Sequence, residues 1–168
     1  MQELIDVLVE TKKTKSIEVA RKLQLLGSGV DKYDLVIRKA DLNLDDAEKI
    51  ASAIYRVSQN NGPNLHTLSM SFNQDLKDEG VLAVLSKIPD TTAVLAFVEC
   101  GITDIAGQAI IDFASKNKEL TGIYIEGNAF SKSMEAKFEK LRIDNPELTV
   151  LSEWASEEFK AMVKRTFD

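Results

Sequence analysis

The chain has 168 residues, 44% of them hydrophobic, and a formal net charge of −6 at pH 7. Its length suits a single domain with its own core, and its acidic balance argues against binding to nucleic acid or to anionic membranes, which attract basic proteins. A single cysteine, Cys100, excludes an internal disulfide and fits a reducing compartment. No stretch approaches the roughly 18 apolar residues of a membrane span, and acidic residues near the start argue against a secretory signal.

Residues 1–32 predict a helical cap that lacks a strand. Their apolar side chains recur at helical spacing in two stretches, MQELIDVLVE and SIEVARKLQLLG, and Gly27 is expected to end the second helix. The positions expected to pack against the rest of the chain are Leu4, Ile5, Leu8, Val9, Val19, Ala20 and Leu23.

Residues 33–147 contain one strand pattern four times. In the fourth copy, LTGIYIEGN, apolar residues at Ile123 and Ile125 are followed three residues later by an asparagine. This asparagine position is occupied, in chain order, by Ala40, Asn73, Cys100 and Asn128, at intervals of 33, 27 and 28 residues. The longest interval contains SQNNGPN, a polar loop rich in turn-forming residues. A period in the twenties is typical of solenoid proteins.

Each strand pattern is followed by apolar residues at helical spacing, which predicts a helix with one buried face. The residues expected on these four buried faces are Ala47, Ile50, Ala51 and Ile54; Val81, Val84, Leu85 and Ile88; Gly107, Ile110, Ile111 and Ala114; and Met134, Phe138 and Leu141. A single strand-helix unit cannot bury its own apolar face, so the four units are expected to stack side by side.

At this point the chain resembles a known family. From Tyr33 to Leu151 its repeats are similar to the L-x-x-L-x-L-x-x-N/C-x-L signature of leucine-rich repeat proteins of the ribonuclease-inhibitor-like class. The first copy departs from it, with Ala40 at the asparagine position, and in the second copy the last leucine, Leu76, comes one residue late. The resemblance implies an α/β fold: a short right-handed solenoid of about four strand-helix repeats, with a parallel sheet on the concave face and helices on the convex face. It implies little about function, because this fold serves many unrelated partners.

Residues 148–168 predict a fifth strand and a second cap. NPELTVL begins a strand at 148–151, and SEWASEEFKAMVKRTFD reads as an amphipathic helix with Ser152 as its N-cap. The side chains expected to face the end of the stack are Ala155, Phe159, Met162 and Val163. We therefore expect one domain, residues 1–168, with helical caps at both ends.

The sequence contains no persuasive catalytic or metal-binding constellation. His66 is the only histidine and lies at the start of a strand, where a surface or hydrogen-bonded role is expected; one histidine without a cysteine cluster does not suggest zinc. Cys100 occupies a turn position of the repeat and is expected to be a buried structural thiol. The carboxylates of DLNLDDAEK lack EF-hand spacing and suit a helix start. We expect neither an enzyme nor a cofactor.

The repeat register predicts which side chains stand on the concave face of the sheet. A partner-binding patch is expected there, apolar at its centre and charged at its rim, because exposed apolar surface of this kind tends to mark contact sites. Its expected residues are Val36, Arg38, Phe72, Val94, Val98, Glu99, Tyr124 and Glu126. The alternative is that valine and tyrosine occur there for strand propensity alone and that Phe72 folds over a neighbour.

Two hypotheses about function follow from this patch. In the first, the chain is a monomeric protein-interaction module that binds another protein, without catalysis, in the cytoplasm, or in a host cytosol if it is a bacterial effector. In the second, it regulates another enzyme as an inhibitor or as a GTPase activator that inserts Arg38 into its partner. The missing constellations disfavour a third possibility, an enzyme in its own right.

Overall fold

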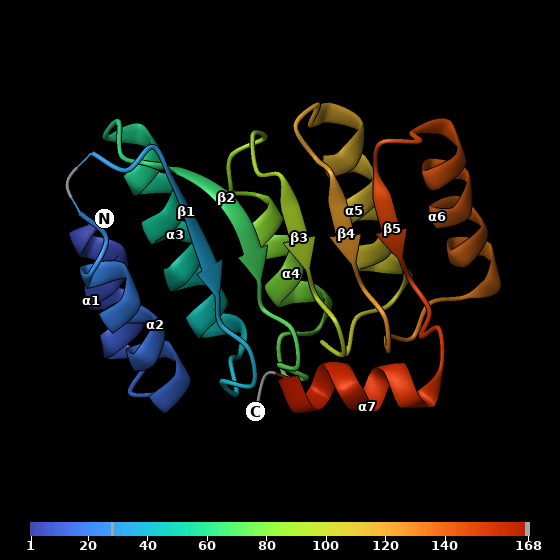
Figure 1. Cartoon of the computed structure of the whole chain (residues 1–168), viewed down its shortest axis with the longest axis horizontal. Helices are drawn as coiled ribbons and strands as arrows, with labels where there is room; N and C mark the ends of the chain where they lie inside the picture. Colours follow the sequence, from blue (N-terminus) through green and yellow to red (C-terminus); the bar gives the residue numbers. More distant parts are fainter. Residues whose placement is uncertain (28, 167–168) are drawn as a thin grey trace.

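The computed structural model describes residues 1–27 and 29–166. It is an α/β structure with one sheet of five parallel strands, whose order in space is their order in the chain (Figure 1). The strands are β1 (Lys32–Val36), β2 (Asn64–Ser69), β3 (Val94–Ala96), β4 (Gly122–Tyr124) and β5 (Thr149–Leu151).

Helices cover one face of the sheet and its β1 edge (Figure 1). Those that follow the first four strands are α3 (Leu44–Gln59), α4 (Lys77–Leu85), α5 (Asp104–Lys116) and α6 (Lys132–Asp144), and each packs on the next. At the β1 end, α1 (Gln2–Glu10) packs on α3 and on α2 (Thr14–Gln24), and α2 also contacts β1. We call the sheet face opposite α3–α6 the open face. None of the helices within the described residues is long and apolar enough to cross a membrane.

The strand register predicted from the repeat intervals is confirmed. Leu68 pairs with Leu35 on one side and with Leu95 on the other, and Ile123 pairs with Leu95 and Val150. These residues share one face of the sheet because side chains alternate along a strand.

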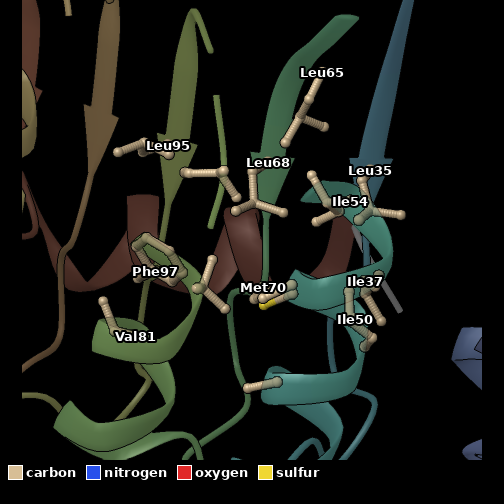
Figure 2. Packing of buried hydrophobic residues seen from close by; sticks show 14 of the residues in the cluster. Leu35, Ile37, Ile50, Ile54, Leu65, Leu68, Met70, Val81, Leu95 and Phe97 are labelled. Carbon is tan, nitrogen blue, oxygen red and sulfur yellow. The ribbon is translucent and has the colours of Figure 1, made fainter. Parts of the chain in front are cut away.

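The core lies between the sheet and the layer of helices (Figure 2). The apolar strand residues meet the helix faces predicted for α3–α6, and Phe97 lies centrally among Met70, Val81 and Leu95.

Two details of the prediction were wrong at the amino-terminal cap. Val9 is 46% exposed, although it was expected to pack against the rest of the chain. The second helix, α2, has Leu25 rather than Gly27 as its C-cap. Both differences lie at the ends of short helices, where apolar spacing constrains the packing least.

Four of the five connections from strand to helix have the same length. Seven residues separate β1 from α3 (37–43), β2 from α4 (70–76), β3 from α5 (97–103) and β4 from α6 (125–131). In two of these turns the asparagine joins neighbouring connections. Asn73 Oδ1 accepts from the N–H groups of Ala40 and Leu42, and its Nδ2 donates to the carbonyls of Ile37 and Met70. The fixed length therefore lets one side chain tie consecutive turns together.

Asn128 makes the corresponding four bonds one pair of turns further along, with Cys100, Ile102, Phe97 and Ile125. Between them, the Cys100 thiol donates to the carbonyl of Met70 at 3.2 Å. The cysteine therefore bridges to the preceding connection, as the asparagine amides do.

The residue before each asparagine position has a left-handed backbone. The φ angles are 50° at Lys39, 63° at Phe72, 48° at Glu99 and 73° at Gly127. This conformation is costly for residues with a Cβ. Val98 and Glu99, which were predicted on one face of a strand, lie in the connection 97–103, after the end of β3.

The carboxyl-terminal helix does not cap the end of the stack. Only five residues (152–156) connect β5 to α7 (Glu157–Thr166), and this helix runs across the carboxyl ends of the strands, from the β5 side toward β1 (Figure 1). Its N-cap is Ser156, whose hydroxyl accepts from the Phe159 N–H at 3.0 Å, rather than Ser152. The helix predicted over 152–168 is thus shorter, and its last two residues lie outside the described part of the chain.

Candidate functional site

The open face contains a cavity of about 350 Å³ between the strands and α7. Its walls are mainly apolar, and four polar side chains interrupt them. The lining residues are Val36, Arg38, Thr67, Ser69, Ala96, Val98, Tyr124, Glu126, Leu151, Phe159 and Val163. A concave site with apolar walls and a few polar groups is the usual form of a binding pocket, and this volume lies in the usual range.

The strands position the floor of the cavity by alternation. Leu35, Leu95 and Ile123 point to the helices, so their neighbours Val36, Ala96 and Tyr124 point to the open face. The same alternation explains why the floor draws at least one residue from each of the five strands or the turn after it.

Polar contacts of α7 hold its carboxyl-terminal half against the turns. Lys164 Nζ lies 2.8 Å from a carboxylate oxygen of Glu99, and Lys160 Nζ lies 3.8 Å from the same atom. In return, the Lys39 ammonium donates to the Lys164 carbonyl at 2.9 Å. No residue of α7 is fully buried, and Phe159 is 36% exposed, so the helix lies along the carboxyl-end edge of the open face (Figure 1) without becoming part of the core.

Glu126 is the most confined ionisable group of the cavity. It is 4% exposed, and its Oε2 atom has no hydrogen-bond partner among the described residues. Burial raises the pKa of its carboxyl above the ordinary value, although nearby backbone N–H groups and the Arg38 guanidinium act in the opposite direction. Burial likewise lowers the pKa of Arg38, while the charge of Glu126 raises it. The two side chains therefore form an interacting pair of opposite charge within mainly apolar walls.

The eight residues predicted for the partner-binding patch on the concave face divide into two groups. Val36, Arg38, Val98, Tyr124 and Glu126 line the cavity together. The other three do not line it. Phe72 lies in its turn with the Arg38 and Lys39 cations each 5.5 Å from the ring centroid, Val94 is half-buried at the start of β3, and Glu99 is paired with α7.

Sequence reasoning missed the contribution of α7 to this site. Phe159 and Val163 were expected to face the end of the stack, and instead they form the wall opposite the sheet. Two signals in the sequence could have revealed this placement. The connection after β5 is two residues shorter than the other four and, unlike them, contains neither asparagine nor cysteine. Lys160 and Lys164 lie on one helix face, one turn apart, where both reach Glu99.

Trp154, in the connection between β5 and α7, lies beside the cavity. Its Nε1 atom is buried and has no hydrogen-bond partner among the described residues. A Cβ added to Gly127 would come within 2.9 Å of that nitrogen, so the indole packs against the turn that follows Glu126. Trp154 is not among the residues that line the cavity.

Cys100 and His66 lie outside the cavity. His66 Nδ1, in β2, is 3.2 Å from a carboxylate oxygen of Asp34 in the middle of β1. Cys100 is fully buried, and burial raises the pKa of its thiol to about 12. Within residues 1–27 and 29–166, no three His, Cys, Asp or Glu side chains gather closely enough to hold a metal ion.

We expect the folded protein to resist thiol alkylation. Thiolate is the reactive form of cysteine. At about pH 8 the raised pKa of Cys100 keeps its thiol protonated, and burial keeps reagents away from the sulfur. Maleimide labelling followed by mass spectrometry should show slow modification of the native chain and fast modification in denaturant. Equally fast modification in both conditions would contradict the buried position of Cys100.

Comparisons with known proteins give no family. No model of a protein family matches the sequence, and no curated protein is similar enough to be matched to it. The geometry of the open face is therefore the basis for the function proposed below.

Proposed function

We propose that the chain is a short right-handed leucine-rich-repeat solenoid of the ribonuclease-inhibitor-like class, and that it binds a partner protein through its open face. In such a solenoid this is the concave face. The fold proposal is supported by the chain-ordered parallel sheet, the four seven-residue connections and the equivalent bonds of Asn73 and Asn128. Stacked repeats use an extended face of this kind for binding.

The cavity is the observation that carries the binding proposal. An open face evolved only for solubility would present polar side chains, whereas here Val36, Leu151 and Phe159 remain more than one third exposed around an apolar hollow. Exposed apolar surface with a charged rim tends to mark a contact site. The rim cations and acids, Lys39, Lys164 and Glu99 among them, would then select partners by charge.

A regulator that inserts Arg38 into another enzyme receives less support. An inserted arginine has to project from the surface, whereas Arg38 is half-buried, interacts with Glu126 and stacks over Phe72. We therefore propose a non-catalytic binding module and a partner that approaches the open face as a whole.

Truncation of Tyr124 should weaken partner binding. Tyr124 is half-buried in the cavity, and aromatic side chains in such pockets dominate the binding energy of interfaces, so Tyr124→Ala should cost about 1–3 kcal/mol of binding. A pull-down supplies the partner, and titration calorimetry beside a thermal melt measures both variants. The matched control is Tyr55→Ala, because Tyr55 is exposed on α3, on the other side of the sheet.

Two outcomes of this experiment would argue against the proposal. If Tyr124→Ala and Tyr55→Ala bind the partner equally well, the partner uses another surface. If Tyr124→Ala loses affinity together with a large drop in melting temperature, Tyr124 stabilises the fold and the lost affinity reflects unfolding.

A further inference from the structure

The two ends of the sheet are covered differently. At one end α1 and α2 pack over β1 and α3, whereas at the other end β5 is the last strand of the sheet. The helix expected to cap the β5 end, α7, runs across the carboxyl ends of the strands instead (Figure 1). The end repeats of a solenoid usually need a cover, and a bare strand edge readily pairs with another strand. The surface that β5 and α6 present at this end is therefore a candidate contact surface.

The backbone of β5 presents hydrogen-bonding groups at this end. The Thr149 N–H donates to the Thr121 carbonyl at 3.0 Å. The Leu151 carbonyl accepts from the Ile125 N–H at 2.8 Å. Both β5 residues thus direct these backbone groups toward β4 and its following turn. Because backbone groups alternate between the two edges of a strand, the N–H and the carbonyl of Val150 point away from β4, at the free edge.

Two grooves lie between β5 and α6, and their charges differ. The acidic groove is lined by Glu135, Ala136, Glu139, Val150, Leu151, Ser152 and Glu153. The arginine groove is lined by Arg142, Ile143, Pro146, Leu148, Thr149, Val150 and Leu151. We call the residues of the two grooves together the end face. Val150 and Leu151 belong to both grooves, so the grooves meet at this level of the strand. Three carboxylates line the acidic groove, whereas the charged side chain in the lining of the other groove is that of Arg142.

The end face is complementary to itself. If two β5 strands pair antiparallel about a twofold axis at Val150, the N–H of each Val150 meets the carbonyl of the other, so one residue closes two bonds. The same axis reverses the order of the grooves, and the acidic groove of each copy then faces the arginine groove of the other. Exposed apolar side chains at Ile143 and Leu151 are covered as well. A strand of an unrelated protein would satisfy the edge but would leave the division of charge unexplained.

We propose that two copies of this chain associate through their end faces, with the β5 strands paired antiparallel and each α6 beside its copy. This dimer replaces the monomer expected from the sequence, and it does not depend on the partner of the open face. The Val150 side chain lies in the core of each copy, and opposite residues of an antiparallel pair share one face. Both helix layers therefore lie on one side, and the two open faces lie side by side on the other.

Sedimentation equilibrium and amide exchange of the full chain test the association and the strand pairing. The chain should have the mass of two copies at high concentration and dissociate on dilution. A chain that stays monomeric up to about 1 mM would overturn the proposal. In the NMR experiment the Val150 N–H should exchange more slowly as the concentration rises, whereas the Thr149 N–H, already bonded to Thr121, should exchange at a constant rate. Unchanged exchange at Val150 in a dimeric sample would overturn the pairing of the strands.

Charge reversals on α6 test which surfaces meet. Glu139 and Arg142 bond each other within one chain, and they line the grooves on either side of the level where the grooves meet. Glu139→Arg gathers arginines at the axis and Arg142→Glu gathers carboxylates, so each variant alone should dissociate with a Kd raised about tenfold or more. An equimolar mixture of the two variants should recover the dimer, because each charge then meets its opposite.

Two further proteins complete this experiment. The doubly substituted chain, E139R/R142E, only reverses the order of the charges and should also recover the dimer. The control is Lys137→Glu, because Lys137 is exposed on α6 but bonds Gln108 of α5 on the side away from the end face, and it should associate like the unmodified chain. Recovery in the mixture also verifies that both single variants are folded. A mixture that stays monomeric, or single variants that associate as tightly as the Lys137→Glu control, would overturn the proposal.

Discussion

Replacing Phe97 with alanine should lower the free energy of unfolding by about 3–5 kcal/mol, the usual cost of truncating a buried phenylalanine. Phe97 is fully buried and lies at the centre of the core, between the sheet and the helices (Figure 2). Its neighbours come from different repeats, so they cannot all move inward to fill the space that is left. Urea melts of the two proteins measure the difference. This loss is a large fraction of the total free energy of unfolding of a typical domain, roughly 5–15 kcal/mol.

Phe159 is the matched control for this substitution. It has the same side chain but lies on α7, where it is 36% exposed and borders a cavity that already exists. Phe159→Ala should therefore shift the urea midpoint by much less than Phe97→Ala. Similar shifts for the two variants would mean that α7 belongs to the core, against the contacts described above.

The second large loss of folding stability is expected when Asn73 is replaced by alanine. Its amide bonds five backbone groups of two consecutive turns, and the residue is 1% exposed, so water cannot replace the lost partners without a rearrangement. Because a stranded buried polar group costs about 1–3 kcal/mol, Asn73→Ala should destabilise the fold by about 2–4 kcal/mol in a urea melt.

Substitutions of two other asparagines serve as comparisons for Asn73→Ala. Asn128 makes four corresponding bonds but is only half-buried, so solvent can take over part of them and Asn128→Ala should cost less. Asn145 is exposed at the end of α6, with a single bond to the Leu141 carbonyl, and its replacement should have little effect. An order other than Asn73, Asn128, Asn145 would show that the amide bonds do not set the cost.

The sequence predicted the sheet register because two local rules agree. Successive side chains along a strand point to opposite faces of the sheet. The interval between successive asparagine positions gives the difference in residue number between paired positions on neighbouring strands. Leu68 and Leu95 could thus be paired from their positions in the chain alone, and the loop SQNNGPN explained the one longer interval. The helix faces followed from spacing alone, as at Ile50 and Ile110.

The placement of α7 could not be predicted by these rules. Spacing shows that a helix has an apolar side but not which surface that side meets, and Phe159 and Val163 suit the end of the stack as well as the open face. The decision depends on long-range contacts, such as those of Lys160 and Lys164 with Glu99. For the same reason the sequence could not predict the cavity, although five of its lining residues had been expected in the partner-binding patch on that face.

At three of the left-handed turn positions the chain has a residue with a side chain, although glycine would be less strained there. At Lys39, Phe72 and Glu99 glycine would relieve a backbone strain of about 1–3 kcal/mol each. Glycine would also delete the Lys39 bond to α7, the Phe72 ring beneath Arg38 and the carboxylate that holds Lys164. Only the fourth turn has glycine at this position, Gly127, and there an added Cβ would come within 2.5 Å of the Glu99 side chain. At Lys39 and Glu99 the backbone strain therefore opposes the docking of α7, so a substitution to glycine at either position would loosen the helix while relieving the strain of the turn beneath it.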